Sequence, residues 1–295
     1  MHVFVTGATG WIGSATVAEL VAAGHRVTGL ARDPARGEAL AKATGATILA
    51  GTLADTDRLA AAADKADAVI HLGFNHDFAH FAANAAEDQA AIAAMGAVLA
   101  GKRLLTTGGV AMLTPGRTAT ESDAPAAQEG MPRRSEQATR ALLERGVRAA
   151  TVRLSPTVHG IGKDMVDRGF VPLLMGIARE TGVSAYPGDG ANRWPAVHRD
   201  DAARLYRLAL ESDDAMPAYH GVAEEGIAVR TIAEAIGALL GLPVESREPA
   251  HFGWFAGFAS MDAPASSALT RTALDWAPTG PTLLEDLADP AYARR

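Results

Sequence analysis

The sequence predicts an α/β fold built on a doubly wound parallel sheet of the Rossmann type. Short apolar runs alternate with Ala-rich stretches of helical length over roughly the first 160 residues. A glycine-rich turn directly follows the first of these runs. Alternation of this kind, with short connections, is typical of a parallel sheet that is covered by helices on both faces.

Six of the apolar runs are predicted strands: residues 3–5, 27–30, 47–49, 68–72, 103–106 and 149–154. The Ala-rich stretches between them are predicted helices. After residue 159 the alternation ends. Residues 160–190 are a mixed Gly-rich and apolar stretch, residues 200–210 form another predicted helix, and residues 222–295 are richer in Pro.

The composition narrows the possible functions. A chain of 295 residues with 48% hydrophobic content can bury one large core or two moderate ones. The net charge of -7 and the lack of a Lys/Arg-rich run argue against a nucleic-acid partner. Without Cys the chain has neither disulfides nor thiolate metal ligands.

The same survey gives an expected location. No apolar run is long enough to span a bilayer, and the first residues resemble a strand rather than a signal peptide. We therefore expect a cytoplasmic protein with a small-molecule substrate and no membrane partner. Homodimer formation is left open.

The glycine-rich turn, Thr6 to Gly13, is the strongest single signal. It joins an apolar strand to a predicted helix over residues 14–23, and a second predicted strand follows at βαβ distance. Exposed N–H groups and the helix dipole at such a turn stabilise a pyrophosphate. Gly7 permits the tight turn, Gly10 lets the backbone approach the phosphates, and Gly13 lets the helix pack closely on the strand. The turn predicts a dinucleotide site; a purely structural turn is the alternative.

Five further segments accompany this turn in the order expected of one family. They are Gly-Thr-Leu-Ala-Asp at 51–55, Ala-Val-Ile-His-Leu-Gly at 68–73, Arg-Leu-Ser-Pro-Thr-Val-His-Gly at 153–160, Val-His-Arg-Asp-Asp-Ala-Ala at 197–203 and Leu-Asp-Trp-Ala-Pro at 274–278. Together with Thr-Gly-x-x-Gly-x-x-Gly at 6–13, they resemble the extended and atypical short-chain dehydrogenase/reductases, the NAD-dependent epimerase/dehydratase family. The resemblance covers nearly the whole chain.

The resemblance implies a domain organisation and a set of cofactor contacts. It implies a Rossmann domain that binds NADP(H) over residues 1–160, with residues 190–222 crossing back into it. Residues 161–295 would then form a smaller, mainly substrate-binding domain. The residues expected to contact the cofactor are Gly7, Thr9, Gly10, Trp11, Ile12, Gly13, Arg32, Thr52, Leu53, Leu72, Gly73, Thr106, Ser155, Thr157 and Val158.

The end of the second strand bears on which nicotinamide cofactor is bound. NAD-specific members of the family place an acidic side chain there for the ribose 2′-hydroxyl, whereas a 2′-phosphate requires a cation. This chain has Arg32 there, with Arg36 one turn later, and Arg32 can pair bidentately with a phosphate. We therefore expect NADP(H). NAD(H) is the alternative, in which Arg32 is only a solvated surface residue.

The catalytic positions are where the chain departs from the family it resembles. Thr107 matches the hydroxyl that normally bonds the substrate oxygen. No Tyr is followed by Lys four residues later, and Pro132 and Glu136 occupy the positions of that pair without supplying a phenol or a cation. Atypical members carry other basic residues, so the candidates for a rebuilt site are Arg133, Arg134 and His159. The alternatives are a solvated helix start for the two arginines and a packing role for the histidine.

These departures lead to an expected reaction class. Reduction of an ordinary ketone creates a strongly basic alkoxide, whereas a quinone or conjugated enone yields a delocalised anion that Arg and a Thr hydroxyl could hold. We therefore expect an NADP(H)-dependent oxidoreductase that acts on an activated carbonyl, enone or quinone-like metabolite. The aromatic cluster at residues 251–258 could wall a pocket for such a ligand, or instead form a domain core or an oligomer contact.

Two other function classes stay open. Sugar-nucleotide epimerase or dehydratase chemistry is the enzymatic alternative, but it begins by oxidising an alcohol, for which the Tyr base is normally required. A protein that senses NADP(H) without catalysis is the alternative from another class. No metal site is expected, because His76 and His80 have helical i, i+4 spacing but no evident third ligand.

Overall fold

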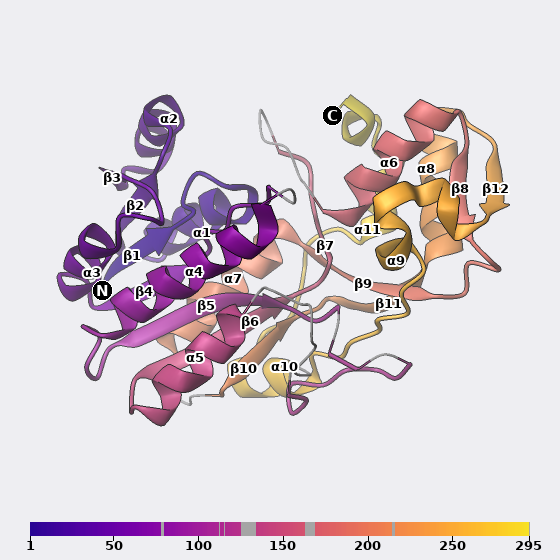
Figure 1. Cartoon of the computed structure of the whole chain (residues 1–295). Coiled ribbons are helices and arrows are strands. Elements are labelled where there is room, and N and C mark those ends of the chain that lie inside the picture. Colours follow the sequence, from indigo (N-terminus) through magenta and orange to yellow (C-terminus); the bar gives the residue numbers. More distant parts are fainter. Residues whose placement is uncertain are drawn as a thin grey trace.

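The computed structural model describes residues 1–77, 80–111, 113–114, 116–124, 134–162, 169–213 and 216–294. These residues form a seven-stranded sheet, a three-stranded sheet and a two-stranded sheet. In Figure 1 the seven-stranded sheet lies at the left, the two-stranded sheet at the right, and the three-stranded sheet between them. Within the described ranges, no helix combines the length and apolarity that a bilayer span requires.

The seven-stranded sheet is parallel throughout, in the order β10-β6-β5-β4-β1-β2-β3. Its strands are β1 (His2–Thr6), β2 (Arg26–Ala31), β3 (Thr47–Ala50), β4 (Ala68–His71), β5 (Arg103–Gly109), β6 (Arg148–Leu154) and β10 (Ala218–Gly221). The predicted doubly wound parallel sheet is confirmed. The strand order reverses between β1 and β4, and ligands of such folds bind outside the carboxyl ends of the strands at this point.

Successive residues of each strand enter two different cores, because strand side chains alternate between the faces of a sheet. Val3 and Val5 pack with α1 (Trp11–Ala22) and α7 (Arg199–Glu211) on one face. Phe4 packs on the other face with α3 (Thr56–Asp64), α4 (Phe81–Gly96) and α5 (Ser135–Glu144). Burial on both faces explains why the strands are continuous apolar runs. Helix α2 (Pro34–Thr44) lies against β2 and β3.

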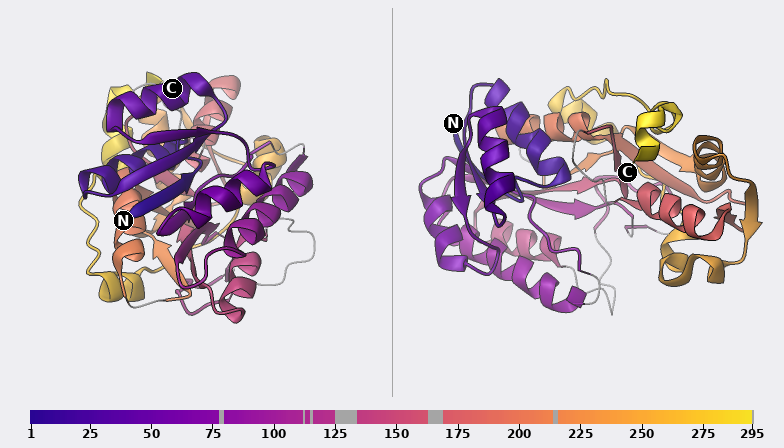
Figure 2. Two further views of the ribbon diagram at one scale, coloured as in Figure 1. Left: turned by 90° about the vertical axis from the view of Figure 1, so that its left-hand side faces the viewer. Right: turned by 90° about the horizontal axis from the view of Figure 1, so that it is seen from above.

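The remaining elements form a second lobe. The three-stranded sheet contains β7 (Thr157–His159), β9 (Arg193–His198) and β11 (Glu224–Ala228), and the two-stranded sheet pairs β8 (Ser184–Pro187) with β12 (Val244–Arg247). Around them lie α6 (Phe170–Thr181), α8 (Val229–Leu240), the 3-10 helix η2 (Pro249–Phe255), α9 (Ala256–Ala259), α11 (Leu283–Ala288) and η3 (Pro290–Arg294). Their core contains Trp194, Phe252 and Phe255. Figure 2 shows this lobe beside the large sheet in the view from above.

The two halves of the chain are interleaved. Strand β10 pairs with β6 at the edge of the large sheet, and α7 packs against α1, although both elements follow β8 and β9 of the second lobe. Leu274 at the end of α10 (Ala268–Leu274) and Trp276 join the same core as α7. Late segments of the chain therefore complete the layer that covers one face of the large sheet.

Candidate functional site

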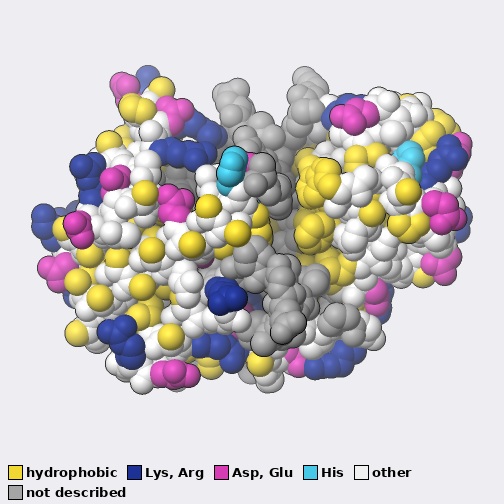
Figure 3. All heavy atoms as spheres, viewed as in Figure 1, with side chains coloured by type: hydrophobic (Ala, Val, Ile, Leu, Met, Phe, Trp, Pro, Cys, Tyr) yellow, Lys and Arg dark blue, Asp and Glu magenta, His cyan; other side chains and the backbone are white. Residues whose placement is uncertain are grey.

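A cavity of about 1090 Å³ lies between the large sheet and the second lobe. Its lining comes from the turn after β1, the carboxyl ends of β2, β4 and β5, the segment after β6, and, across from these, α6 and η2. Figure 3 shows a hollow between the two lobes, with hydrophobic side chains gathered on its right-hand wall. The cavity thus includes the point where the strand order reverses.

Most of the residues expected to contact a cofactor line this cavity: Gly7, Thr9, Gly10, Trp11, Ile12, Gly13, Arg32, Thr52, Leu53, Leu72, Gly73, Ser155 and Val158. Thr106 and Thr157 do not line it, and both are fully buried. The Thr106 hydroxyl instead bonds the hydroxyls of Thr139 at 2.7 Å and Thr151 at 3.1 Å. Strand alternation turns these two side chains into the interior, away from the cavity.

The turn after β1 has the shape of a pyrophosphate cradle. Gly7 has φ of +65°, and a Cβ there would lie 2.7 Å from the backbone nitrogen of Gly73. A Cβ on Gly13 would lie 2.1 Å from the carbonyl oxygen of Gly7, so α1 approaches β1 as closely as only glycine permits. Gly10 is the N-cap of α1 and forms no side-chain cap bond, which leaves the first helical N–H groups for a ligand. The residues present therefore fit a dinucleotide.

The cavity is cationic at the end of β2. Arg32 and Arg36 line it there and are exposed. The neighbouring carboxylate of Asp33 caps α2, because it accepts hydrogen bonds from the backbone N–H groups of Ala35 at 2.9 Å and Arg36 at 3.3 Å. Among the described lining residues, the carboxylates are those of Asp77, Glu87 and Glu136, and none of these follows β2.

Thr107 lines the cavity, but its hydroxyl is already engaged. It donates to the carbonyl oxygen of His71 at 2.9 Å and lies 2.7 Å from the hydroxyl of the fully buried Tyr206. Because a hydroxyl carries one proton and a carbonyl can only accept, Thr107 accepts from Tyr206 while it donates to His71. A substrate oxygen that needs a donor at Thr107 would have to replace the bond to His71.

The three basic residues predicted to take part in catalysis lie in different surroundings. Arg134 is exposed, precedes α5 and lines the cavity. Arg133, like Pro132, lies outside the described residues. His159 is fully buried and does not line the cavity, and its Nδ1 lies 2.6 Å from Oδ2 of Asp286. The structure places His159 in the packing between β7 and α11, so the packing role is the one that its surroundings favour.

Glu136 lines the cavity and forms a bidentate ion pair with Arg153. Nε of Arg153 donates to Oε2 at 2.9 Å and Nη2 donates to Oε1 at 2.6 Å. Arg153 is fully buried, and its other N–H groups point to the backbone oxygens of Glu121 and Asp123 and to Nε2 of His220. Oε1 of Glu136 also accepts from Nε and Nη2 of Arg140, at 3.3 Å and 3.2 Å, so this carboxylate near α5 is shared by two guanidinium groups.

His220 completes this buried network. Burial lowers the pKa of its imidazole, and a neutral ring can accept from Arg153 at Nε2 while Nδ1 donates to the carbonyl of Ser266 at 2.7 Å. Sequence reasoning missed the network because its members are far apart along the chain. The only local signal was that Arg153 begins one of the family-like segments.

A second buried polar chain supports the turn after β4. The backbone N–H of Gly73 donates to the Thr6 hydroxyl at 3.1 Å, and that hydroxyl lies 2.7 Å from Nδ1 of His71. Nε2 of His71 lies 3.0 Å from Oδ1 of Asp88, whose Oδ2 accepts from the Ser135 hydroxyl at 2.6 Å. This chain joins β1, β4, α4 and α5 directly behind the cavity. A lone Asp on the apolar side of an Ala-rich helix was the signal that could have indicated it.

The aromatic cluster at residues 251–258 contributes both to the core of the second lobe and to the lining of the large cavity. Phe252 and Phe255 are buried in the core of the second lobe. Trp254, with 62% of its surface exposed, lines the cavity together with Phe255 and Phe258. Phe74 and Phe81 line it as well, in edge-to-face contact with each other. This part of the cavity is therefore largely apolar and aromatic.

The two histidines with helical spacing do not meet at a metal site. His76 lines the cavity, whereas Nδ1 of His80 lies 2.8 Å from Oδ2 of Asp77. Among the described residues, no group of three or more ligating side chains is placed to hold a metal ion.

The fold and the cradle define a Rossmann protein of the dinucleotide-binding type. Residues 3–222 match the family described as "NAD dependent epimerase/dehydratase family". Because the match spans most of the chain, the protein belongs to this family.

Comparison with individual proteins agrees with this assignment. The chain is 46% identical over 301 residues to an uncharacterized protein of Schizosaccharomyces pombe, a match that covers 99% of this chain and 100% of that one. UDP-glucuronic acid 4-epimerase from Bacillus cereus, solved with UDP-glucuronic acid and NAD, has a TM-score of 0.74 at 18% identity, covering 100% of this chain and 99% of that chain. The dTDP-glucose 4,6-dehydratase DesIV from Streptomyces venezuelae, solved with NAD and TYD, has a TM-score of 0.77 at 20% identity, covering 99% and 96%. At these identities the two structures share the fold.

Gly13→Ala tests the close approach of α1 to β1. The added Cβ would lie 2.1 Å from the carbonyl oxygen of Gly7, so we expect the free energy of unfolding in urea to fall by roughly 2 kcal/mol or more. Gly176→Ala in α6 is the control, because its Cβ would meet no atom within 4 Å. Its stability should be unchanged or slightly raised. Equal stabilities for the two variants would contradict the packing described here.

Glu136→Gln tests the buried ion pair. The substitution leaves the guanidinium of Arg153 buried without a counter-charge, and we expect a loss of roughly 3 kcal/mol in the free energy of unfolding at neutral pH. Glu144→Gln, an exposed position on the same helix, should change it by less than about 0.5 kcal/mol. A Glu136→Gln protein as stable as the control would show that Arg153 does not depend on this carboxylate.

Proposed function

We propose that the protein is an NADP(H)-dependent oxidoreductase that moves hydride to or from an activated carbonyl, enone or quinone-like substrate. The observation that carries the proposal is the composition of the large cavity. One end has a pyrophosphate cradle and two arginines, and the other end has an aromatic wall. Hydride transfer is the chemistry that the nicotinamide supplies when bound; binding, orientation and charge stabilisation belong to the chain.

The preference for NADP(H) rests on the end of β2. Arg32 and Arg36 can pair with a 2′-phosphate, and the one carboxylate beside them, that of Asp33, is used to cap α2. The two family structures described above were solved with NAD. The cations at this position are what favours the phosphorylated cofactor for this chain.

The substrate class follows from the opposite wall. The described residues that α6 and η2 contribute to the lining are Phe170, Leu173, Trp254 and Phe255, none of which carries a charge. A sugar nucleotide presents a diphosphate that would require cations or backbone donors on such a wall. A flat apolar ligand would instead bury its faces against these rings.

Charge stabilisation is assigned to Arg134. The chain has no Tyr that is followed by Lys four residues later, so that pair supplies no phenol as a proton donor. Glu136 is engaged in its ion pair with Arg153. The Arg134 guanidinium stays charged at neutral pH and can hold an enolate or phenolate oxygen as negative charge develops, until water protonates it. A guanidinium alone does not stabilise a strongly basic alkoxide enough, so the substrate carbonyl must be an activated one.

Sugar-nucleotide epimerase or dehydratase activity is the second candidate. It is favoured by the family to which the chain belongs and by the structures that share its fold, which include such enzymes. It is disfavoured by the missing Tyr and Lys and by the uncharged wall. A protein that senses NADP(H) without turnover is the remaining alternative.

Arg32→Gln tests the cofactor preference. We expect the dissociation constant of NADPH to rise about tenfold or more, because a charge-assisted pair with the 2′-phosphate is lost, while that of NADH stays the same. Titration by nicotinamide fluorescence measures both constants. Arg26→Gln, at the opposite end of β2, is the charge-matched control. An unchanged NADPH constant in Arg32→Gln would remove the argument for NADP(H).

A substrate panel tests the reaction class. Wild-type protein with NADPH should reduce quinones and conjugated enones, followed by nicotinamide absorbance, and should leave UDP- and dTDP-sugars unchanged. Arg134→Gln should lower kcat/KM for the best quinone about 100-fold, whereas Arg145→Gln, exposed at the far end of α5, should not. Turnover of sugar nucleotides would favour the second candidate, and tight NADPH binding without any turnover would favour the sensor.

A further inference from the structure

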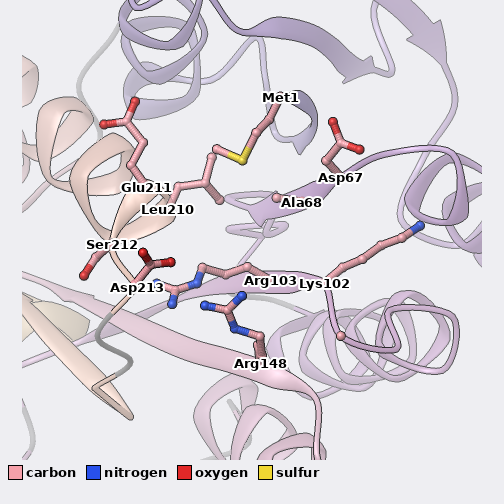
Figure 4. A pocket seen from close by; sticks show the side chains of 11 residues that line it. Met1, Asp67, Ala68, Lys102, Arg103, Arg148, Leu210, Glu211, Ser212 and Asp213 are labelled. Atoms are coloured by element: carbon pink, nitrogen blue, oxygen red, sulfur yellow. The ribbon is translucent and has the colours of Figure 1, made fainter.

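A second cavity, of about 240 Å³, lies at the amino ends of the strands of the large sheet, opposite the carboxyl ends that face the larger cavity. It is bounded by the amino ends of β4, β5 and β6 and by the carboxyl end of α7, and it shares no lining residue with the larger cavity. Figure 4 shows Arg103 and Arg148 reaching into it below Glu211 and Asp213. Neither the family assignment nor the proposed function uses this cavity.

Three cationic and three anionic side chains line this cavity, but several already have partners. Nζ of Lys102 donates to the carbonyl of Asp64 at 2.6 Å. Oδ2 of Asp67 accepts from the backbone N–H of His2 at 2.6 Å. The carboxylate of Glu211 lies 2.8 Å from His25 Nε2 and 2.7 Å from Nη1 of Arg207. Arg103 donates from one nitrogen only, to the carbonyl of Ala209, and no ion pair of the described residues includes Arg103, Arg148 or Asp213.

The two arginines are placed where they repel each other. Arg103 on β5 is the register partner of Arg148 on β6, so both side chains leave the same face of the sheet. Like charges directly opposite one another on a sheet are destabilising. Within the described part of the chain, no carboxylate oxygen lies within 4.0 Å of either guanidinium. Neither guanidinium therefore forms an ion pair there, although Glu211 and Asp213 line the same cavity.

Burial makes the need for a negatively charged or accepting partner stronger at Arg103. Its side chain is 6% exposed, and Nη1 donates to the carbonyl of Ala209 near the end of α7. Through this bond, Nη1 caps the carboxyl end of α7. Nη2 is buried and has no hydrogen-bond partner. A buried donor on a charged group is costly when unpaired, so an acceptor is expected here.

We propose that this cavity binds a small doubly charged oxyanion between Arg103 and Arg148. Planar guanidinium groups match two oxygens of a phosphate or carboxylate, and two of them match two negative charges. The volume admits an ion of the size of phosphate or a short dicarboxylate rather than a nucleotide. Of the three lining carboxylates, that of Asp213 forms no ion pair or hydrogen bond with the described residues and can compete with the ligand, so its removal should strengthen binding.

Inorganic phosphate and succinate are the probes, titrated calorimetrically into the full chain at constant ionic strength set with NaCl. Arg148→Gln should weaken binding of the preferred probe about tenfold or more, and Asp213→Asn should strengthen it a few-fold. Arg145→Gln, exposed and three residues before Arg148, is the charge-matched control and should bind as wild type does. A preference for phosphate or succinate tells the two oxyanion sources apart.

The glycine-rich turn and Arg32 could also hold phosphate, so the measured quantity is the part of the binding that Arg148→Gln removes and Arg32→Gln does not. The proposal is overturned if Arg148→Gln binds both probes as tightly as Arg145→Gln, or if wild type binds neither probe beyond the NaCl baseline. Because Arg148 is exposed, its substitution should leave the fold intact. These outcomes do not depend on whether NADP(H) binds.

Discussion

The close approach of α1 to β1 is the constraint on which the rest of the molecule depends. It exists because Gly13 brings no Cβ against the carbonyl of Gly7, and because Gly7 itself takes a positive φ. The approach directs the first N–H groups of α1 toward the large cavity. It also fixes Trp11, whose Nε1 donates to the carbonyl of Val158 at 2.7 Å and whose ring lies 4.5 Å below Arg199. The packing of α1 on β1 thus positions both the glycine-rich cradle and the contacts of Trp11 with β7 and α7.

The polar groups behind the cavity are bonded to one another, and these bonds hold the shape of the cavity. Thr107 is bonded to Tyr206 and His71, and Glu136 is neutralised by Arg153. Glu136, Arg153 and His220 form an internal network that joins α5, β6 and β10.

Local signals were sufficient to predict the sheet and the cradle, because strand runs, helix runs and glycine turns are read within a few residues. Most of the residues that these signals predict to contact a cofactor line the large cavity. Thr106 and Thr157 are buried and do not line it, because a motif locates a strand end but strand alternation decides which side chain faces the cavity. Pairs such as Glu136 with Arg153, or His159 with Asp286, join segments that are distant in sequence, and no pattern in either segment reveals the other.

The return of the chain to its first sheet has a consequence for synthesis on the ribosome. The edge strand β10 ends at Gly221, and the apolar cover over β5 and β6 includes Tyr206, Leu274 and Trp276. A nascent chain that has emerged only as far as β6 carries an unpaired strand edge and an uncovered hydrophobic face. The large sheet and its helical cover can therefore be completed only after nearly the entire polypeptide has been synthesised. The two lobes are then expected to complete their folding together.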